Sequence, residues 1–230
     1  MKKNKYVIPA LVMIFALLIL TSCTDLIKYV EENEHTATVS GDHTTVSPQN
    51  TTRIALYWEN TTSPKPERKP WSDALISALD KNFATLDKAT DNKRFCPKYS
   101  SLSKEKKLKA LGELFVAMAY FESGYNPESS SVDVGKKDDL NSYSVGLYQM
   151  SGNDSAAKLF KADYKALKNP ITNINVAVEQ MRKQIVNTGL FILPNTSKYR
   201  YWAVLLDNNK YSKVAQIIER VNKYAPECKL

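Results

Sequence analysis

The sequence predicts a mainly α-helical domain in which any β-structure is limited to a small hairpin element. Several segments carry apolar residues at spacings of three and four, which is the pattern of a helix with one buried face. No stretch of the folded part alternates apolar and polar residues as a half-buried strand would. The polar loop at residues 129–143 has room for a short hairpin at most.

Residues 1–22 have the features of a secretion signal. Three lysines precede an apolar run at residues 7–20, which is short for a membrane span. The run leads directly into Leu-Thr-Ser-Cys, ending at Cys23, which resembles a lipobox, the bacterial signal for lipid attachment to a cysteine. The resemblance implies that Cys23 becomes the acylated N-terminus and anchors the protein to a membrane without spanning it. An ordinary signal peptide with an incidental cysteine is the alternative.

Residues 23–70 are expected to form a flexible, lipid-anchored tether. Polar residues and proline dominate this stretch, so it buries too little apolar surface to offset its ordering entropy. The apolar patch Ile54–Trp58 is the exception and could dock on the domain as a short strand. The folded domain is therefore expected at residues 71–230.

Two helices are expected in the first part of this domain. The first begins at Ser72 or Asp73, either of which can cap a helix, and is followed by a loop at residues 91–101. The second runs from about Lys104 to Ser123, with Ser103 as its cap. Their predicted core stripes are Leu75, Ile76, Leu79, Phe83 and Leu86, and Leu108, Leu111, Phe115, Met118 and Ala119.

Three further helices are expected towards the C-terminus. Asn153 or Asp154 can cap a short one, and the pair Asn169-Pro170 opens a longer one. The last covers residues 212–224 and ends at Pro226. Core positions in the two longer helices are Ile174, Val178, Met181 and Ile185, and Val214, Ile217, Ile218 and Val221.

The chain contains three cysteines. If Cys23 carries lipid, Cys96 and Cys228 remain as an even pair in a protein exported to an oxidising compartment. A disulfide between them would tie the C-terminus to the start of the central helix. Two free buried thiols are the alternative.

The formal net charge is +8, and removing the three lysines of the signal leaves +5. A mildly basic exported protein suits an anionic cell wall. Export and the lack of a nucleic-acid motif argue against nucleic acid as a partner. No cysteine, histidine or carboxylate cluster has metal-ligand spacing, and no cofactor is expected.

Glu122 is the candidate catalytic residue. It falls in the last turn of the predicted helix 104–123, which Gly124 and Pro127 end. The helix dipole and the surrounding aromatic residues both disfavour a charged carboxylate, so we expect a raised pKa. An acid that stays protonated near neutral pH can donate its proton to a glycosidic oxygen. On this helix alone, a solvated helix-end glutamate is the alternative.

Two motifs together resemble the soluble lytic transglycosylases. These are Glu122-Ser123-Gly124 at the helix end and Gly146-Leu147-Tyr148-Gln149 about twenty residues later. The resemblance implies a lysozyme-like helical fold and cleavage of peptidoglycan between MurNAc and GlcNAc. It also implies Glu122 as the single general acid and base, and 1,6-anhydro-muramyl products. We expect the substrate-binding residues to be Ser123, Ser144, Gly146, Leu147, Tyr148, Gln149 and Tyr201.

The chain departs from the family pattern near its C-terminus. The usual Ala-Tyr-Asn-Ala-Gly motif, whose tyrosine faces the glutamate, is replaced by a stretch in which Asp207 takes the tyrosine position. Tyr201 or Tyr199 could supply the hydroxyl instead. A hydrolase of the same fold, similar to goose-type lysozymes, would use an aspartate such as Asp133 or Asp207 to position water. A non-catalytic wall-binding lipoprotein is the third hypothesis.

Overall fold

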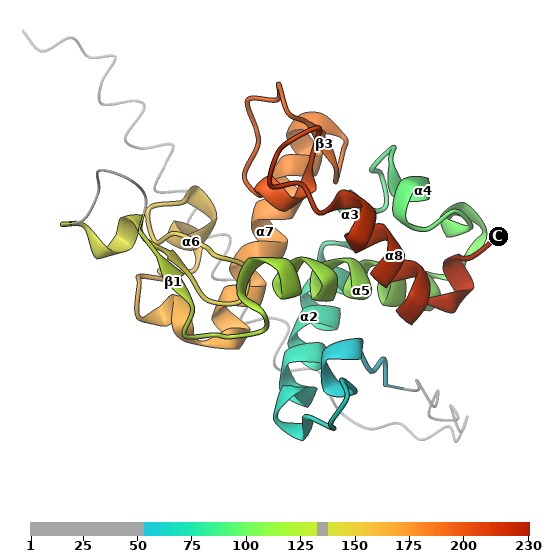
Figure 1. Ribbon diagram of the computed structural model, residues 1–230, viewed down its shortest axis with the longest axis horizontal. Helices are drawn as coiled ribbons and strands as arrows, with labels where there is room; N and C mark the ends of the chain where they lie inside the picture. Colours follow the sequence, from blue (N-terminus) through green and yellow to red (C-terminus); the bar gives the residue numbers. More distant parts are fainter. Residues whose placement is uncertain (1–52, 133–137) are drawn as a thin grey trace, which may run out of the picture. The chain divides into compact units, whose positions relative to one another are not determined.

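Helix α5 (Lys104–Ser123) is the centre of the fold in the computed structural model, which describes residues 53–132 and 138–230 (Figure 1). Every residue from Ala110 to Ala119 is buried, so neighbouring elements cover this helix on all sides. The Lys106 N–H donates to the Ser103 side chain at the start, and Gly124 ends the helix in a left-handed conformation with φ of 62°. The predicted bounds and core stripe of this helix are confirmed.

The other helices pack around α5 and against one another (Figure 1). Helix α2 contacts both α5 and α7, and helix α8 contacts α5 and α4. The Asn169 side chain accepts hydrogen bonds from two backbone N–H groups at the start of α7, as expected for its cap. The helices around α5 are α2 (Lys69–Lys81), α3 (Phe83–Leu86), α4 (Asn92–Phe95), α6 (Ser155–Leu159), α7 (Pro170–Thr188) and α8 (Val214–Tyr224).

Short 3-10 turns and strands connect these helices. The predicted hairpin is present: β1 (Ser130–Ser131) pairs antiparallel with β2 (Ser144–Val145). A second pair, β3 (Leu193–Pro194) and β4 (Leu206–Asp207), is parallel. The 3-10 turns are η1 (Tyr57–Glu59), η2 (Pro66–Arg68), η3 (Tyr99–Ser101), η4 (Leu140–Ser142), η5 (Ala166–Lys168), η6 (Ala203–Leu205) and η7 (Pro226–Cys228). The predicted mainly α fold with a small β-hairpin is confirmed.

The folded unit begins earlier than the predicted boundary at residue 71. Leu56 and Trp58 are fully buried, and the Trp58 indole donates to the Ser72 hydroxyl (2.7 Å). Gly112 in α5 makes room for Leu56, because a Cβ there would come within 2.7 Å of its Cδ2. The expected strand at residues 54–58 is wrong, since these residues lead into the 3-10 turn η1. The expected docking of this apolar patch on the domain is nevertheless present, because Leu56 and Trp58 both belong to the core. Cys23 lies outside the described residues.

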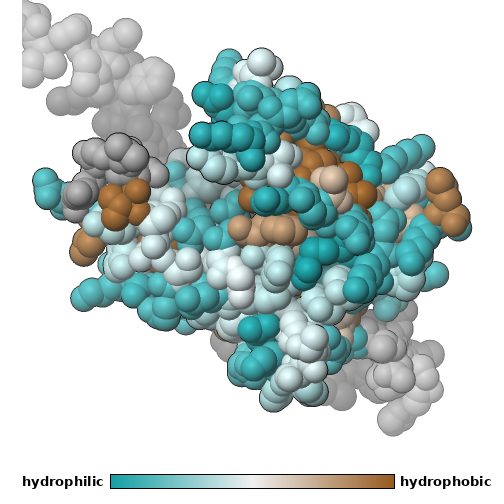
Figure 2. All heavy atoms as spheres, in the orientation of Figure 1, coloured by the Kyte–Doolittle hydropathy of each residue, from teal (hydrophilic) through white to brown (hydrophobic). Residues whose placement is uncertain are grey.

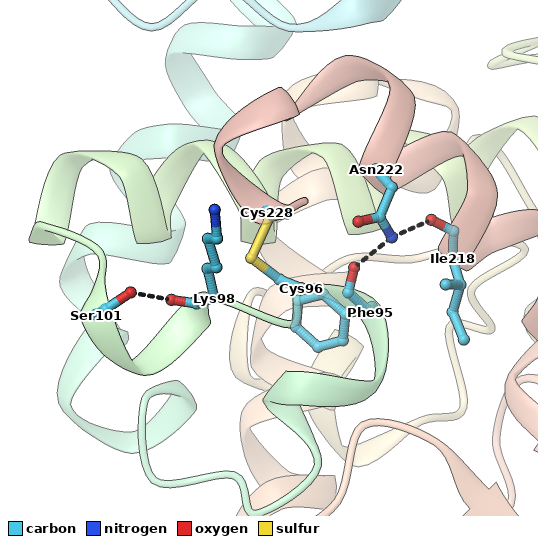
Figure 3. Close-up of a disulfide and its surroundings, with 7 residues drawn as sticks. All are labelled: Phe95, Cys96, Lys98, Ser101, Ile218, Asn222 and Cys228. Atoms are coloured by element: carbon cyan, nitrogen blue, oxygen red, sulfur yellow. Dashed lines mark hydrogen bonds between the residues drawn. A yellow bond between two sulfur atoms is a disulfide. The ribbon is translucent and has the colours of Figure 1, made fainter. Parts of the chain in front are cut away.

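A disulfide joins Cys96 to Cys228, 132 residues apart (Figure 3). Both cysteines are fully buried, and Cys96 follows α4 directly. The Asn222 side chain of α8 donates to the Phe95 carbonyl (3.0 Å), which adds a second link between the same two segments (Figure 3). The C-terminus is therefore attached to the loop that precedes α5.

The surface of the described part is predominantly hydrophilic on the face shown in Figure 2, with small hydrophobic areas among the polar atoms. Within residues 53–132 and 138–230, no helix has both the length and the apolar character needed to cross a membrane.

Reducing the disulfide should lower the free energy of unfolding by about 5 kcal/mol, because a loop this long frees much chain entropy in the unfolded state. Thermal unfolding with and without a reductant measures the effect. The double variant C96S/C228S is the control, and its unfolding temperature should not respond to the reductant. Equal unfolding temperatures for the oxidised and reduced wild-type protein would contradict this prediction.

Candidate active site

Glu122 lies in the last turn of α5, one residue before Ser123 and the left-handed Gly124. Its side chain is half-buried, and burial raises the pKa of its carboxyl group from 4.5 to about 7. No charged partner contributes to this change, so loss of hydration is its cause. Near neutral pH the carboxyl group is therefore about half protonated.

The segment Gly146–Gln149 forms a tight turn closed by Val145 and Met150. These two residues exchange backbone hydrogen bonds of 2.8 and 2.9 Å. Gly146 has φ of 77°, and a Cβ at this position would come within 2.4 Å of the Asn173 side-chain nitrogen. Only glycine fits here, which accounts for the first residue of the Gly-Leu-Tyr-Gln motif.

Asn173 of α7 supports this turn from beneath. Its amide nitrogen donates to the Val145 carbonyl (2.8 Å), and its amide oxygen accepts from the Tyr148 N–H (2.9 Å). The side chain is fully buried, and satisfying its polar atoms fixes the turn relative to α7. Asn173 therefore has a structural role in the site.

Gln149 ends the turn in a left-handed conformation, with φ of 51°. Its amide nitrogen donates to the Gly146 carbonyl (2.9 Å), and its amide oxygen accepts from the Ser131 hydroxyl (3.2 Å). Contacts to both β1 and the turn therefore hold this side chain in place.

Glu122 and Gln149 line one groove of about 460 Å³, a size typical of a small-molecule or sugar site. Serine, asparagine and aromatic side chains make up most of its wall, and no lysine or arginine is among its described lining residues. The lining residues are Glu122, Ser142, Ser144, Gln149, Ser151, Asn153, Asp154, Tyr201, Trp202, Ala203, Val204 and Tyr211.

Tyr201 and Trp202 form the wall contributed by the C-terminal part of the chain. The Trp202 indole donates to the Tyr148 carbonyl (3.0 Å), which fastens this segment to the Gly146–Gln149 turn. The Tyr201 hydroxyl donates to the Asp154 carboxylate and accepts from the Ser151 N–H (3.3 Å). Burial, followed by the charges of Asp154 and Glu122, raises the pKa of Tyr201 well above its ordinary value of 10, so the phenol stays protonated.

The predicted substrate-binding residues divide into two groups. Ser144, Gln149 and Tyr201 line the groove together with Glu122. The other four are not among the residues that line it, namely Ser123, Gly146, Leu147 and Tyr148.

Leu147 and Tyr148 are corrections to the prediction. Both are fully buried and belong to the hydrophobic core, so their side chains do not reach the groove. The Tyr148 ring packs against Phe115 with ring centroids 5.8 Å apart. Ser123 and Gly146 have supporting roles: the Ser123 hydroxyl donates to the Leu147 carbonyl (3.0 Å) and so joins α5 to the turn.

Asp207 does not face Glu122. Arg94 holds its carboxylate through two hydrogen bonds of 2.8 and 2.9 Å, and this pairing lowers the pKa of Asp207. Asp207 is absent from the groove wall, as is Tyr199. The other aspartate considered for hydrolysis, Asp133, lies outside the described residues.

Sequence reasoning missed two groove residues whose side chains could act on a bound sugar, Asp154 and Tyr211. Asp154 was expected only to cap a helix, yet its side chain makes no capping hydrogen bond to α6. Tyr211 is 58% exposed, and exposed aromatic rings in a polar groove suit stacking against the apolar face of a sugar. Tyr211 could have been found from the sequence, because it is an aromatic residue in a polar loop that has no buried helix face to accommodate it.

Comparison with known proteins finds one matching family model and several similar solved structures. Residues 100–204 match the family model described as the transglycosylase SLT domain, a range that includes Glu122, the Gly146–Gln149 turn and Tyr201. No curated protein sequence matches the chain.

Solved structures of one protein, Bd0314 DslA, resemble the chain. Its wild-type form 2 has 28% sequence identity and a TM-score of 0.63, and two glutamate-to-glutamine mutants have 27% and 26% identity with TM-scores of 0.62 and 0.61. Each match covers 77% of this chain and 99% of the other. The predicted lysozyme-like helical fold is therefore confirmed, and residues 100–204 of this chain are similar to the transglycosylase SLT domain.

Proposed function

We propose that the protein is a peptidoglycan lytic transglycosylase that cleaves the bond between MurNAc and GlcNAc, with Glu122 as the general acid and base. One observation carries this proposal: a half-buried carboxyl group with a pKa of about 7 lines the same sugar-sized groove as Gln149. An acid with a pKa near the working pH can both give and take a proton within one catalytic cycle.

The proposed reaction proceeds in two proton transfers. Protonated Glu122 donates its proton to the glycosidic oxygen while the bond from that oxygen to the anomeric carbon breaks, through an oxocarbenium-like transition state. The C6 hydroxyl of the same sugar then attacks the anomeric carbon, and its proton passes to the Glu122 carboxylate. The products are a free GlcNAc end and a 1,6-anhydro-muramyl end, and Glu122 regains its starting protonation.

SLT enzymes act on peptidoglycan, so we place the protein outside the cytoplasm. We further propose that a lipid on Cys23 anchors it to the membrane facing the wall, on the periplasmic side of the outer membrane in a Gram-negative cell. In this arrangement its partners are glycan strands and the membrane.

A hydrolase with the same fold is the second candidate, and one observation favours it. Asp154 places a second carboxylate in the groove, and enzymes that hydrolyse glycosidic bonds commonly use two. A hydrolase would yield reducing muramyl ends, whereas a transglycosylase yields anhydro ends. The chemical nature of the released ends therefore separates the two candidates.

Glu122→Gln should abolish the release of soluble fragments from purified peptidoglycan while leaving the fold intact, because glutamine keeps the shape but has no proton to donate. Mass spectrometry of the wild-type fragments should show anhydro-muramyl ends. Glu105→Gln is the matched control: this exposed glutamate lies in the first turn of the same helix, and its variant should remain fully active.

Full activity of the Glu122→Gln variant would overturn the assignment of Glu122. Reducing ends in place of anhydro ends would favour the hydrolase. Saturable binding to the wall by the wild-type protein, with no fragments released, would instead support a non-catalytic wall-binding role.

Glu122 should also make stability depend on pH. Its carboxyl group has a pKa of about 7 in the folded protein and about 4.5 in the unfolded chain. The free energy of unfolding is therefore highest below pH 4.5 and decreases as the pH rises to 7. The Glu122→Gln variant cannot ionise and avoids this loss. Its unfolding temperature should therefore rise relative to wild type between pH 4.5 and pH 8. A difference that is the same at both pH values would contradict the raised pKa.

A further inference from the structure

Asp154 occupies the position of a helix cap without acting as one. It precedes α6 with extended backbone angles, where an aspartate side chain usually accepts from the first N–H groups of the helix. No such bond forms. Its Oδ2 atom instead accepts from the Tyr201 hydroxyl and from the Ser151 N–H (3.0 Å). The carboxylate is thus directed to Tyr201 and away from its own helix.

The hydrogen bond between Asp154 and Tyr201 joins distant parts of the chain within the groove. Tyr201 lies 47 residues after Asp154, and both side chains line the groove that contains Glu122. The Tyr201 ring also packs against Trp202, with centroids 4.8 Å apart. Two contacts therefore restrict the phenol to one orientation.

The charge of Asp154 is not neutralised by a neighbouring cation. None of the ion pairs within residues 53–132 and 138–230 includes it. Lys183 of α7 donates to the hydroxyl of the next residue, Ser155 (2.9 Å). Asp207 differs, because Arg94 pairs with it outside the groove. Of these two carboxylates, only Asp154 can act on the groove.

We propose that Asp154 is a positioning residue for glycan cleavage: it holds the proton of the Tyr201 hydroxyl, so that the electron-rich phenol oxygen faces the sugar ring whose glycosidic oxygen Glu122 protonates. This inference rests on the proposed function. Positive charge develops on that ring as the glycosidic bond breaks. A fixed, partly negative oxygen with a carboxylate behind it stabilises that charge in the transition state. The Tyr201 proton stays on its oxygen throughout, so no proton is transferred between Tyr201 and Asp154.

Steady-state cleavage of soluble glycan strands tests the proposal with four forms of the full exported chain: wild type, D154N, Y201F and the double variant. Asparagine keeps an oxygen that can accept from Tyr201 but removes the charge. Each single change should lower kcat roughly tenfold or more with little change in KM, since the interaction acts on the transition state. The double variant should be no slower than the slower single variant, because both changes disable one unit.

D163N is the matched control. Asp163 is exposed, lies outside the groove, and accepts from the Ala166 N–H (2.8 Å), a bond that asparagine can replace. Its kcat should match wild type. A D154N enzyme as fast as wild type, or losses that multiply in the double variant, would overturn the role of Asp154 while leaving Glu122 in place. A wild-type chain that releases no fragments would remove the proposed function and this inference together.

Discussion

The burial of one carboxyl group at the end of α5 is the constraint on which the rest of the site depends. Residues Ala110–Ala119 are covered on every side. The last turn is only partly covered, but there Glu122 still loses hydration and gains no charged partner. Placing an acid there opposes folding at neutral pH, because the charged form is desolvated. Because desolvation disfavours the charged form, the carboxyl group keeps a proton that it can donate near neutral pH. The proposed chemistry therefore depends directly on the packing of the helix.

The opposite side of the groove depends on contacts between segments far apart in the chain. Asn173 from α7 supports the Gly146–Gln149 turn, and the Trp202 indole fastens the C-terminal segment to the same turn. Ser123 links α5 to it through the Leu147 carbonyl. Each of these bonds joins a residue beside the groove to a backbone atom of one turn. Glu122 and Gln149 are therefore held on a rigid frame, as a site that must align a proton donor with a sugar oxygen requires.

Much of this arrangement follows from local sequence. The central helix was predictable because its apolar spacing, its serine cap and its terminal Gly124 all indicate the same bounds. The raised pKa of Glu122 followed from its place among aromatic residues at the helix end. Gly146 was recognisable as a turn residue, but the directions of Leu147 and Tyr148 were not. Both side chains are buried in the core, which the motif alone does not reveal.

Other features depend on tertiary contacts that local patterns do not encode. The sequence around Asp154 is that of a helix cap. Its actual partner is Tyr201, which the fold brings from the C-terminal segment. Leu56 and Trp58 stand in a polar stretch, and their burial requires the space that Gly112 leaves on α5. Asp207 stands where the family's tyrosine was expected to face the glutamate, but Arg94 draws it away.

The most direct test of the central claim is titration of the Glu122 carboxyl carbon by NMR in the folded protein, assigned by comparison with the Glu122→Gln variant. The account predicts a midpoint near pH 7, because burial alone disfavours the charged form. A midpoint near 4.5, the ordinary value for a hydrated glutamate, would contradict it and remove Glu122 as the proton donor.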